Sequence, residues 1–164
     1  MRGLVVGRFQ PLHGGHVQLI RKALDECASV VVAVGSNTEP ASARNPFTFE
    51  ERRAMLDAAF PKIRVVGVPD LHDEERWAKH CLALTGPVER AYGNDERALR
   101  LLEAAGVHAV RPGLVRREDW EGTHIRKLML EGDPAWMRRV PPAVALLLES
   151  WDAPNRLRSF AQAP

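Results

Sequence analysis

The sequence predicts an α/β fold in which a mostly parallel sheet is covered by helices on both faces and is followed by a helical C-terminal segment. Short apolar runs rich in valine alternate with longer segments in which apolar residues recur at helical spacing. After Arg111 the valine-rich runs stop, whereas segments of helical period continue. Strands and helices that alternate in this way form β-α-β units, and such units build parallel, Rossmann-like sheets.

The expected strands are short continuous apolar runs, as is typical of strands buried on both faces. In order they are Gly3–Gly7, Ser29–Gly35, Ile63–Val68, Val88–Gly93 and Val107–Val110. The expected helices between them are Gly15–Ala28, Phe49–Phe60, Glu74–Leu84 and Asp95–Ala105. The first helix carries Val17, Ile20 and Leu24 at helical spacing, and Gly106 after the last one is a typical helix stop.

The C-terminal part of the chain is expected to be helical from about residue 123 to residue 164. Short helices are predicted at His124–Leu130, Pro134–Arg139 and Pro141–Trp151, the last two with proline at their starts. The segment Ala153–Pro164 fits either a docked helix or a frayed tail. With no repeat or linker in 164 residues, we expect one domain, residues 1–164.

Composition narrows the class of protein. The net charge of +2 is too small to indicate a nucleic-acid or membrane partner, and no apolar stretch approaches the roughly 20 residues that span a bilayer. The N-terminus lacks the apolar core of a signal peptide. Cys27 and Cys81 form no C-x-x-C pair, which argues against a disulfide framework or a zinc ribbon. We therefore expect a cytoplasmic protein.

The most informative stretch is G-R-F-Q-P-L-H-G-G-H, which follows the first expected strand. Ligands of open parallel sheets bind beyond the carboxyl ends of the strands. His13 and His16 are three residues apart and would share one face of a helix's first turn, after the cation Arg8. Gly14 and Gly15 would let the backbone approach a ligand, and the helix start offers N–H groups to an anion.

Two other interpretations of this histidine pair stay open, namely solvated or capping side chains and half of a metal site. The remaining histidines, His72, His80, His108 and His124, are scattered without the spacing of metal ligands. No dinucleotide fingerprint G-x-G-x-x-G and no P-loop occur in the chain. Position after the first strand therefore favours phosphate chemistry.

A second anion site is predicted at W-E-G-T-H-I-R-K, Trp120–Lys127. Gly122 and Thr123 precede an expected helix, and Arg126 and Lys127 lie in its first turn. Thr123 is a candidate N-cap, and its hydroxyl could instead reach a phosphate.

These motifs together resemble known enzymes. H-G-G-H after a strand resembles the H-x-G-H signature of the nucleotidyltransferase superfamily, and the segment around Thr123 and Arg126 resembles that superfamily's second signature, I-S-x-T-x-I-R. With G-R-F-Q-P, the stretch from Gly35 to Arg52, G-S-N-T…N-P-F-T-F-E-E-R, is similar to the archaeal-type nicotinamide mononucleotide (NMN) adenylyltransferases. V-P-D-L-H-D-E-E-R-W, Y-G-N-D and R-P-G-L-V-R-R-E-D-W fit the same family in order. The resemblance covers essentially the whole chain.

The resemblance implies an enzyme that transfers AMP from ATP, with Mg²⁺, to NMN and yields NAD⁺ and pyrophosphate. The catalytic residues implied are His13, His16 and Arg126. The ATP-binding residues implied are Gly7, Arg8, Phe9, Gln10, Gly15, His16, Asn94, Arg116, Gly122, Thr123 and Arg126. The NMN-binding residues implied are Ser36, Asn45, Asp70 and Trp77, and no protein metal site is expected. The resemblance also implies a homo-oligomer.

Alternatives within this interpretation are another acceptor, namely nicotinic acid mononucleotide, flavin mononucleotide or phosphopantetheine, or a non-catalytic nucleotide sensor. The chain departs from the family pattern at three acidic residues, Glu50, Asp95 and Glu121. Glu121 stands where the family has a phosphate-contacting serine. Since a carboxylate facing triphosphate would repel it, we expect Glu121 to point to solvent or to pair with an arginine such as Arg116.

Overall fold

The computed structural model describes residues 1–113 and 120–162, which include a five-stranded parallel sheet. Its strands are β1 (Arg2–Gly7), β2 (Ser29–Val34), β3 (Arg64–Gly67), β4 (Arg90–Tyr92) and β5 (His108–Val110). They lie in the order β3-β2-β1-β4-β5, and every neighbouring pair is parallel. Strand order reverses between β1 and β4, and this is the point at which such sheets bind ligands.

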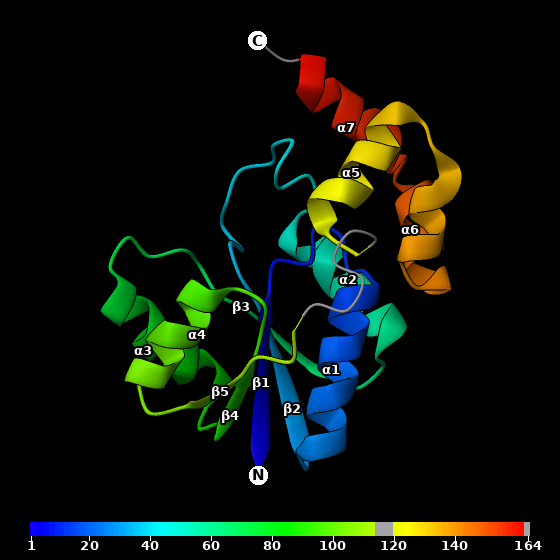
Figure 1. Cartoon of the computed structure of the whole chain (residues 1–164). Helices are drawn as coiled ribbons and strands as arrows, with labels where there is room; N and C mark the ends of the chain where they lie inside the picture. The colour runs from blue at the N-terminus through cyan, green and yellow to red at the C-terminus, as the bar shows by residue number, and fades with distance from the viewer. Residues whose placement is uncertain (114–119, 163–164) are drawn as a thin grey trace.

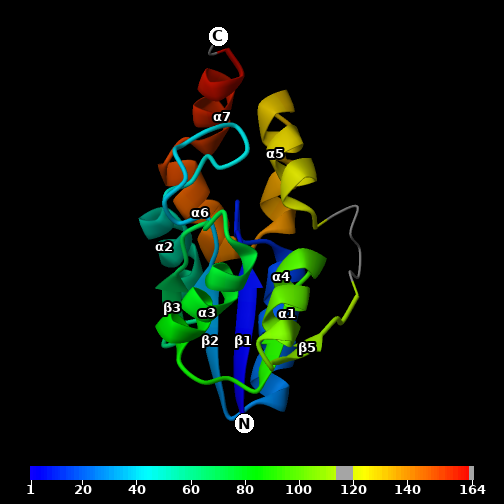
Figure 2. The same ribbon diagram turned by 90° about the vertical axis from the view of Figure 1, so that its left-hand side faces the viewer.

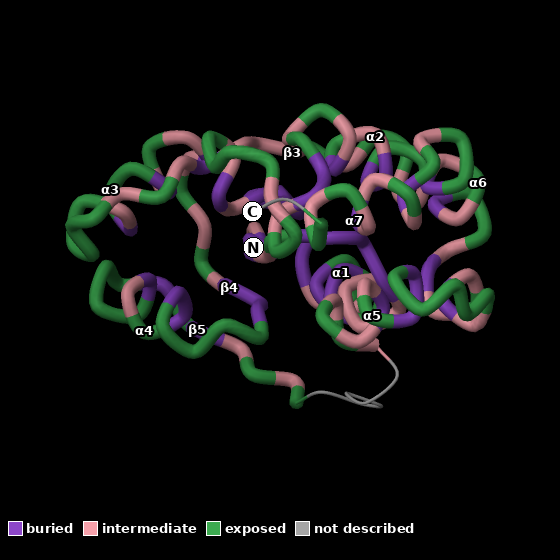
Figure 3. Tube along the Cα trace, turned by 90° about the horizontal axis from the view of Figure 1, so that it is seen from above, coloured by how far each residue is buried: buried purple, intermediate pink, exposed green. Residues whose placement is uncertain are grey.

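Helices cover both faces of the sheet, as the sequence predicts (Figure 1). The helices α1 (Gly14–Glu26) and α2 (Phe49–Ala59) lie on one face, and α3 (Glu74–Thr85) and α4 (Glu96–Ala104) lie on the other. Successive strand residues point to opposite faces, so Val5 packs with Ile20 of α1 whereas Leu4 packs with Leu99 of α4. Buried residues follow the strands and the inner sides of the helices (Figure 3).

The C-terminal segment consists of α5 (Gly122–Glu131), a 3₁₀ helix η1 (Pro134–Arg139), α6 (Pro142–Ser150) and α7 (Ala153–Gln162). The helices α5 and α7 stand beyond the carboxyl ends of the strands, whereas α6 lies beside α2 (Figures 1 and 2). Trp136, Leu148 and Leu157 belong to the same apolar cluster as Val5. Of the two structures that the sequence allowed for the segment after residue 152, the docked helix is the one observed. It extends to Gln162, and Leu157 is only 1% exposed.

Side-chain caps explain where several helices begin. Thr48 and Glu51 form a reciprocal capping box at the start of α2, and Asp73 and Asp95 cap α3 and α4. Each cap satisfies backbone N–H groups that have no partner within the helix, a contribution of about 1 kcal/mol. Within the described residues, no helix combines the length and the apolar character needed to cross a membrane.

Candidate active site

A cavity of about 520 Å³ opens at the carboxyl edge of the sheet, where β1, β2 and β4 end and α1, α3 and α4 pass close by. Several of the predicted site residues line it: Gly7, Arg8, His16, Ser36, Asp70, Trp77 and Asn94. Glu39, His72, Glu74 and Arg97 also line it, and the sequence motifs did not single them out. The topology thus brings some of the predicted ATP-binding and NMN-binding residues around one space, whereas His13, Asn45, Thr123 and Arg126 are not among its lining residues.

His13 and His16 occupy the start of α1. The N–H of Gly15 donates to Nδ1 of His13 (3.1 Å), and the N–H of His13 donates to Nδ1 of His16 (3.2 Å). The two side chains therefore form a capping box in which each imidazole accepts one backbone donor. Their rings stack with centroids 3.7 Å apart, and the ring of Phe9 lies 4.5 Å from that of His16.

Both imidazoles are neutral around pH 7. Burial and the nearby Arg126 cation lower the pKa of His13 to about 3. Burial and the adjacent His13 lower the pKa of His16 well below its usual value. Since both Nδ1 atoms accept hydrogen bonds, each neutral ring carries its proton on Nε2. Two fixed N–H donors therefore stand at a helix N-terminus, which suits them to phosphate oxygens.

The glycines of this motif serve packing, which differs from the role expected for Gly14. A Cβ on Gly14 would lie 2.5 Å from the indole of Trp120, so the indole covers this position and keeps a ligand away from it. A Cβ on Gly15 would lie 3.0 Å from the ring of His13. Gly15 also lines a second cavity of about 250 Å³, together with Asn94 and Lys22. The sequence located the turn correctly, but the close approach at Gly14 is made by Trp120.

The side chains of Phe9 and Gln10 make contacts within the protein, and their expected contact with ATP stays a prediction. Phe9 has no exposed surface, and its ring packs against the ring of His16. The side-chain amide of Gln10 donates to the carbonyl of Phe47 (2.9 Å) and accepts its N–H (3.0 Å). Because this pairing uses both ends of the amide, Gln10 joins the first loop to the loop before α2.

Arg126 reaches the first loop from α5. Its Nη1 donates to the carbonyl of Gln10 (2.7 Å), and its Nη2 lies 3.4 Å from the hydroxyl of Thr123. Burial, followed by the nearby cations Arg44 and Arg8, lowers the pKa of Arg126. Arg44 and Arg8 thus act on Arg126, and Arg126 acts on His13, so positive charge is concentrated on this side of the site, which favours a polyanion. The sequence motifs did not single out Arg44.

The start of α5 differs from the expected one. The helix begins at Gly122 and Glu121 is its N-cap, because the carbonyl of Glu121 already accepts the N–H of Ile125 (3.0 Å). Thr123 is therefore in the first turn, and the prediction that it is the N-cap was wrong. A Cβ on Gly122 would lie 3.0 Å from Nη1 of Arg126, so glycine leaves room for that side chain.

Glu121 is exposed and makes no side-chain cap. Its charge acts on Arg126, whose pKa it raises in part. The expected alternative, a pair with Arg116, lies outside the described residues, as does the predicted contact of Arg116 with ATP.

A pair of side chains from the segments that follow β2 and β3 lies at the predicted mononucleotide site. The hydroxyl of Ser36 donates to the carboxylate of Asp70 (2.6 Å) across the ends of β2 and β3. Trp77, in the first turns of α3, is half-buried and lines the cavity. Asn45 does not line this cavity, and its Oδ1 is buried without a hydrogen-bond partner in the structure. Ser36, Asp70 and Trp77 are thus brought together, and Asn45 stands apart from them.

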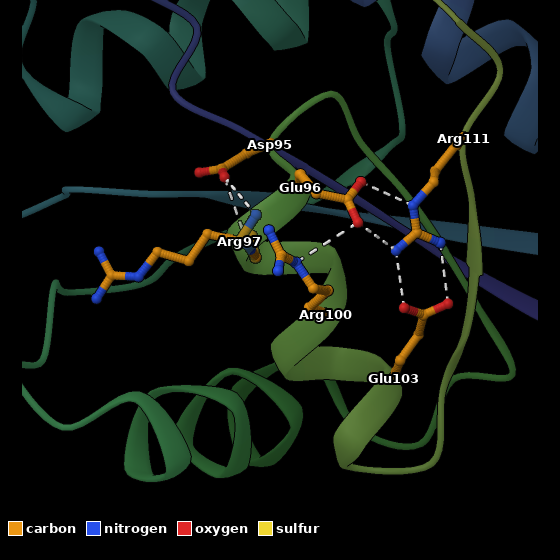
Figure 4. Close-up of polar contacts among 7 residues, drawn as sticks. Asp95, Glu96, Arg97, Arg100, Glu103 and Arg111 are labelled. Carbon is orange, nitrogen blue, oxygen red and sulfur yellow. Dashed lines mark hydrogen bonds and ion pairs between the residues drawn. The ribbon is translucent and has the colours of Figure 1, made fainter.

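The extra acid Asp95 has a local role. Its carboxylate caps α4 by accepting the N–H groups of Arg97 (3.0 Å) and Ala98 (3.4 Å). The side chain of Arg97 points away from the neighbouring cluster, in which Arg111 is held by Glu96 and Glu103 (Figure 4). Arg97 pairs instead with Glu74 (2.8 Å). The carboxylate of Asp95 is therefore engaged by the helix start, and the charge of Glu74 is offset by Arg97.

The described residues offer no cluster of protein ligands for a metal ion. Among residues 1–113 and 120–162, no three His, Cys, Asp or Glu side chains gather to hold a metal ion. The charge that acts on His13 is instead the Arg126 cation, on which Arg8 and Arg44 act in turn. A divalent ion would have to bring most of its ligands with it.

Comparisons with known proteins agree with this geometry. A family model described as cytidylyltransferase-like matches residues 4–127. The nicotinamide-nucleotide adenylyltransferase of Picrophilus torridus is 34% identical over 168 residues, with 99% of each chain covered. That of Aeropyrum pernix is 37% identical over 168 residues, with 98% of each chain covered.

A solved structure of a bifunctional NMN adenylyltransferase/ADP ribose pyrophosphatase from Francisella tularensis, complexed with AMP and a manganese ion, shares the fold. Its TM-score is 0.74 at 19% sequence identity, and the match covers 97% of this chain and 51% of that one. This chain therefore spans about half the length of that protein. Near-complete coverage by the archaeal relatives settles the family: the chain belongs to the cytidylyltransferase-like family and, within it, to the nicotinamide-nucleotide adenylyltransferases.

Proposed function

We propose that this chain transfers the adenylyl group of ATP to NMN and releases NAD⁺ and pyrophosphate. One observation carries the proposal. A single cavity is lined by His16 and Arg8, groups suited to phosphate, and also by Trp77 and Asp70. An indole can stack on a pyridine ring, and a carboxylate can accept from a carboxamide or a ribose hydroxyl. Both substrates of the reaction thus find complementary groups in one space.

The reaction follows from charge and position. An oxygen of the NMN 5′-phosphate forms a bond to the α-phosphorus of ATP, while the bond from that phosphorus to the oxygen bridging to the β-phosphate breaks. Pyrophosphate leaves with the bonding electron pair. The attacking phosphate is already ionised, so no general base is required. Catalysis then depends on in-line placement and on donors aimed at the oxygens where charge grows.

The residues of the first turn would supply those donors. We assign the Nε2–H groups of His13 and His16 to oxygens of the triphosphate, with His16 stabilising the transition state. Arg8, Arg126 and the hydroxyl of Thr123 would bind other phosphate oxygens, and Arg44 joins them through its proximity to Arg126. Neutral imidazoles suit this task because Nδ1 accepts a backbone N–H while Nε2 still donates.

Mg²⁺ is proposed to enter the site bound to ATP, where it offsets the charge of the triphosphate. The donor set supports this assignment, since the Arg126 cation rather than a carboxylate cluster acts on His13 in the described residues. Triphosphate oxygens and water would then supply its ligands.

The charges of the cavity favour the amide NMN over nicotinic acid mononucleotide as the acceptor. Glu39, Asp70, Glu74 and Asp95 line the cavity, and the only arginines among its described lining residues are Arg8 and Arg97. Since Arg97 is already paired with Glu74, an added carboxylate on the pyridine ring would meet net negative charge. We expect kcat/KM to be higher for NMN than for its acid.

Three broader features are part of the same proposal. We propose one domain over residues 1–164, because a single apolar cluster joins Val5 of the sheet to Leu157 of α7. A cytoplasmic location is supported by Cys27 and Cys81, which are both free thiols. A homo-oligomer is our expectation for its quaternary structure, and light scattering of the purified protein would test it.

The decisive experiment measures pyrophosphate release with ATP and Mg²⁺ against a panel of mononucleotides: NMN, nicotinic acid mononucleotide, flavin mononucleotide and phosphopantetheine. We expect the highest kcat/KM with NMN. A preference for another acceptor would change the substrate within the same enzyme class. Tight ATP binding without turnover of any acceptor would instead support a nucleotide sensor.

A further inference from the structure

Arg52, in the first turns of α2, is a buried cation without a carboxylate partner. It is only 2% exposed, although arginine is almost never fully buried unless it is paired. Among the described residues no carboxylate lies within the 4.0 Å that defines an ion pair with it. Burial and the nearby Arg8 lower the pKa of Arg52 to about 10, and the charges of Asp70 and Glu50 act in the opposite direction, so the guanidinium stays charged around pH 7.

Main-chain carbonyls take the place of a counter-ion. Nη1 donates to the carbonyls of Gly35 (2.7 Å) and Arg8 (3.0 Å), and Nη2 donates to that of Ser36 (3.1 Å). Nε donates to the carbonyl of Thr48 (3.2 Å), the N-cap of its own helix. One planar guanidinium thus joins the chain leaving β1, the chain leaving β2 and the start of α2.

Three of these carbonyls belong to residues that line the proposed phosphate-binding cavity, where exposed carbonyl oxygens would repel an anion. The residues Arg8, Gly35 and Ser36 all line the 520 Å³ cavity. A carbonyl oxygen is the negative end of a peptide dipole, and oxygens facing the cavity would oppose a phosphate. Because these oxygens accept hydrogen bonds from the buried guanidinium of Arg52, they face the protein interior. The charge of Arg52 also offsets their negative ends.

The same bonds hold an unusual backbone conformation. Ser36 has φ of 52°, a left-handed value that is uncommon for a residue with a side chain. The carbonyl of Ser36 is held by Arg52, and its hydroxyl is held by Asp70 (2.6 Å). Without the hydrogen bond from Arg52, the backbone of Ser36 would no longer be held in this conformation. Its hydroxyl would then no longer be held against Asp70.

We propose that Arg52 is a positioning residue for adenylyl transfer: its guanidinium holds the main chain of Arg8 and Ser36 so that the Arg8 cation and the Ser36–Asp70 pair face the substrates. This inference rests on the proposed function. Lysine at this position keeps the charge but has a single nitrogen on a flexible stem, so it cannot bind all four carbonyls with the same geometry.

The test compares R52K with R64K. Arg64 is the matched control because its guanidinium also donates to two main-chain carbonyls, those of Thr85 (2.8 Å) and Leu84 (3.0 Å). It begins β3 and therefore lies at the opposite edge of the parallel sheet from the cavity. Thermal unfolding measures what each lysine does to the fold, and initial rates give kcat and KM for ATP and NMN.

We expect both variants to lower the melting temperature, but only R52K to raise KM for NMN and to lower kcat, together by roughly 10- to 100-fold in kcat/KM. R64K should keep both constants within about twofold of the parent. R52M, which removes the charge as well, should be worse than R52K for both substrates; if R52M does not fold, R52K alone decides.

The outcomes separate the two proposals. If the parent and R64K are active and R52K retains the parental kcat and KM at a temperature where it is folded, Arg52 is only structural and the inference is wrong. If the folded parent releases no pyrophosphate with any mononucleotide, the proposed function is wrong. In that case ATP binding by calorimetry still tests Arg52, since positioning of Arg8 predicts a weaker Kd in R52K than in R64K.

Discussion

The imidazole of His13 stacks on that of His16, with 3.7 Å between the ring centroids and 26° between the ring planes. The N–H of His13 also donates to Nδ1 of His16, so one residue fixes both the orientation and the tautomer of the other. Burial lowers the pKa of both rings, and a nearby charge lowers each further: the Arg126 cation for His13 and His13 itself for His16. The pair therefore acts as two neutral Nε2–H donors.

Loss of the His16 side chain should affect catalysis more than ATP binding. His16→Ala is expected to lower kcat by at least roughly 100-fold with a modest change in KM for ATP, because its hydrogen bond strengthens as charge develops on the phosphate oxygens. Steady-state kinetics measure both constants. The control is His80→Ala, an exposed histidine on α3 outside the cavity. An undiminished kcat in His16→Ala would show that this imidazole has no part in the transition state.

Protonation of His13 should destabilise the fold. Its pKa is about 3 in the folded protein and 6.5 in the unfolded chain, so the unfolded state binds more protons between these values. Stability contributed by this group is therefore full above pH 6.5 and falls as pH decreases towards 3, with a slope of up to about 1.4 kcal/mol per pH unit.

The variant His13→Asn isolates this contribution. Asparagine keeps an acceptor for the N–H of Gly15 but does not titrate. We expect the stability of the parent to decrease more steeply between pH 6.5 and 4 than that of the variant, measured by urea unfolding. Parallel curves for the two proteins would contradict the neutral state of His13.

Removal of the indole from the cavity should affect one substrate only. Trp77→Ala is expected to raise KM for NMN about 10-fold while leaving KM for ATP near the parental value, because stacking and burial of a ring together contribute on the order of 1–2 kcal/mol. Trp77→Phe should recover part of the loss. An equal rise in both KM values would mean that Trp77 supports the fold of α3 rather than the pyridine ring.

The carboxylate of Glu121 should have a small effect on ATP. Since it is exposed, its repulsion is screened to about 1 kcal/mol even at 4 Å. Glu121→Ser is therefore expected to lower KM for ATP by no more than about fivefold. Titration of the parent and the variant with ATP at low and high salt measures this. A much larger improvement would show that the carboxylate faces the triphosphate.

Local signals predicted most of the fold. The strand expected at Ser29–Gly35 is Ser29–Val34, and the helix expected at Phe49–Phe60 is Phe49–Ala59. Valine runs and side-chain caps act on residues a few positions apart, so they can be read from the chain. The start of α5 was missed because threonine is a preferred N-cap residue and glutamate is not, whereas in the fold Glu121 takes the N-cap position without a side-chain cap.

The sequence by itself determined the α/β fold, the placement of two histidines at the first strand-to-helix turn and the similarity to adenylyltransferases. Only the tertiary structure decided which side chains line the cavity and which hold its main chain in place. Gln10 pairs with Phe47 and Arg52 binds the carbonyl of Arg8, contacts between residues 37 and 44 positions apart. Neither is encoded by spacing, because each depends on parallel strands that bring their carboxyl ends to one edge and bury the polar groups left there.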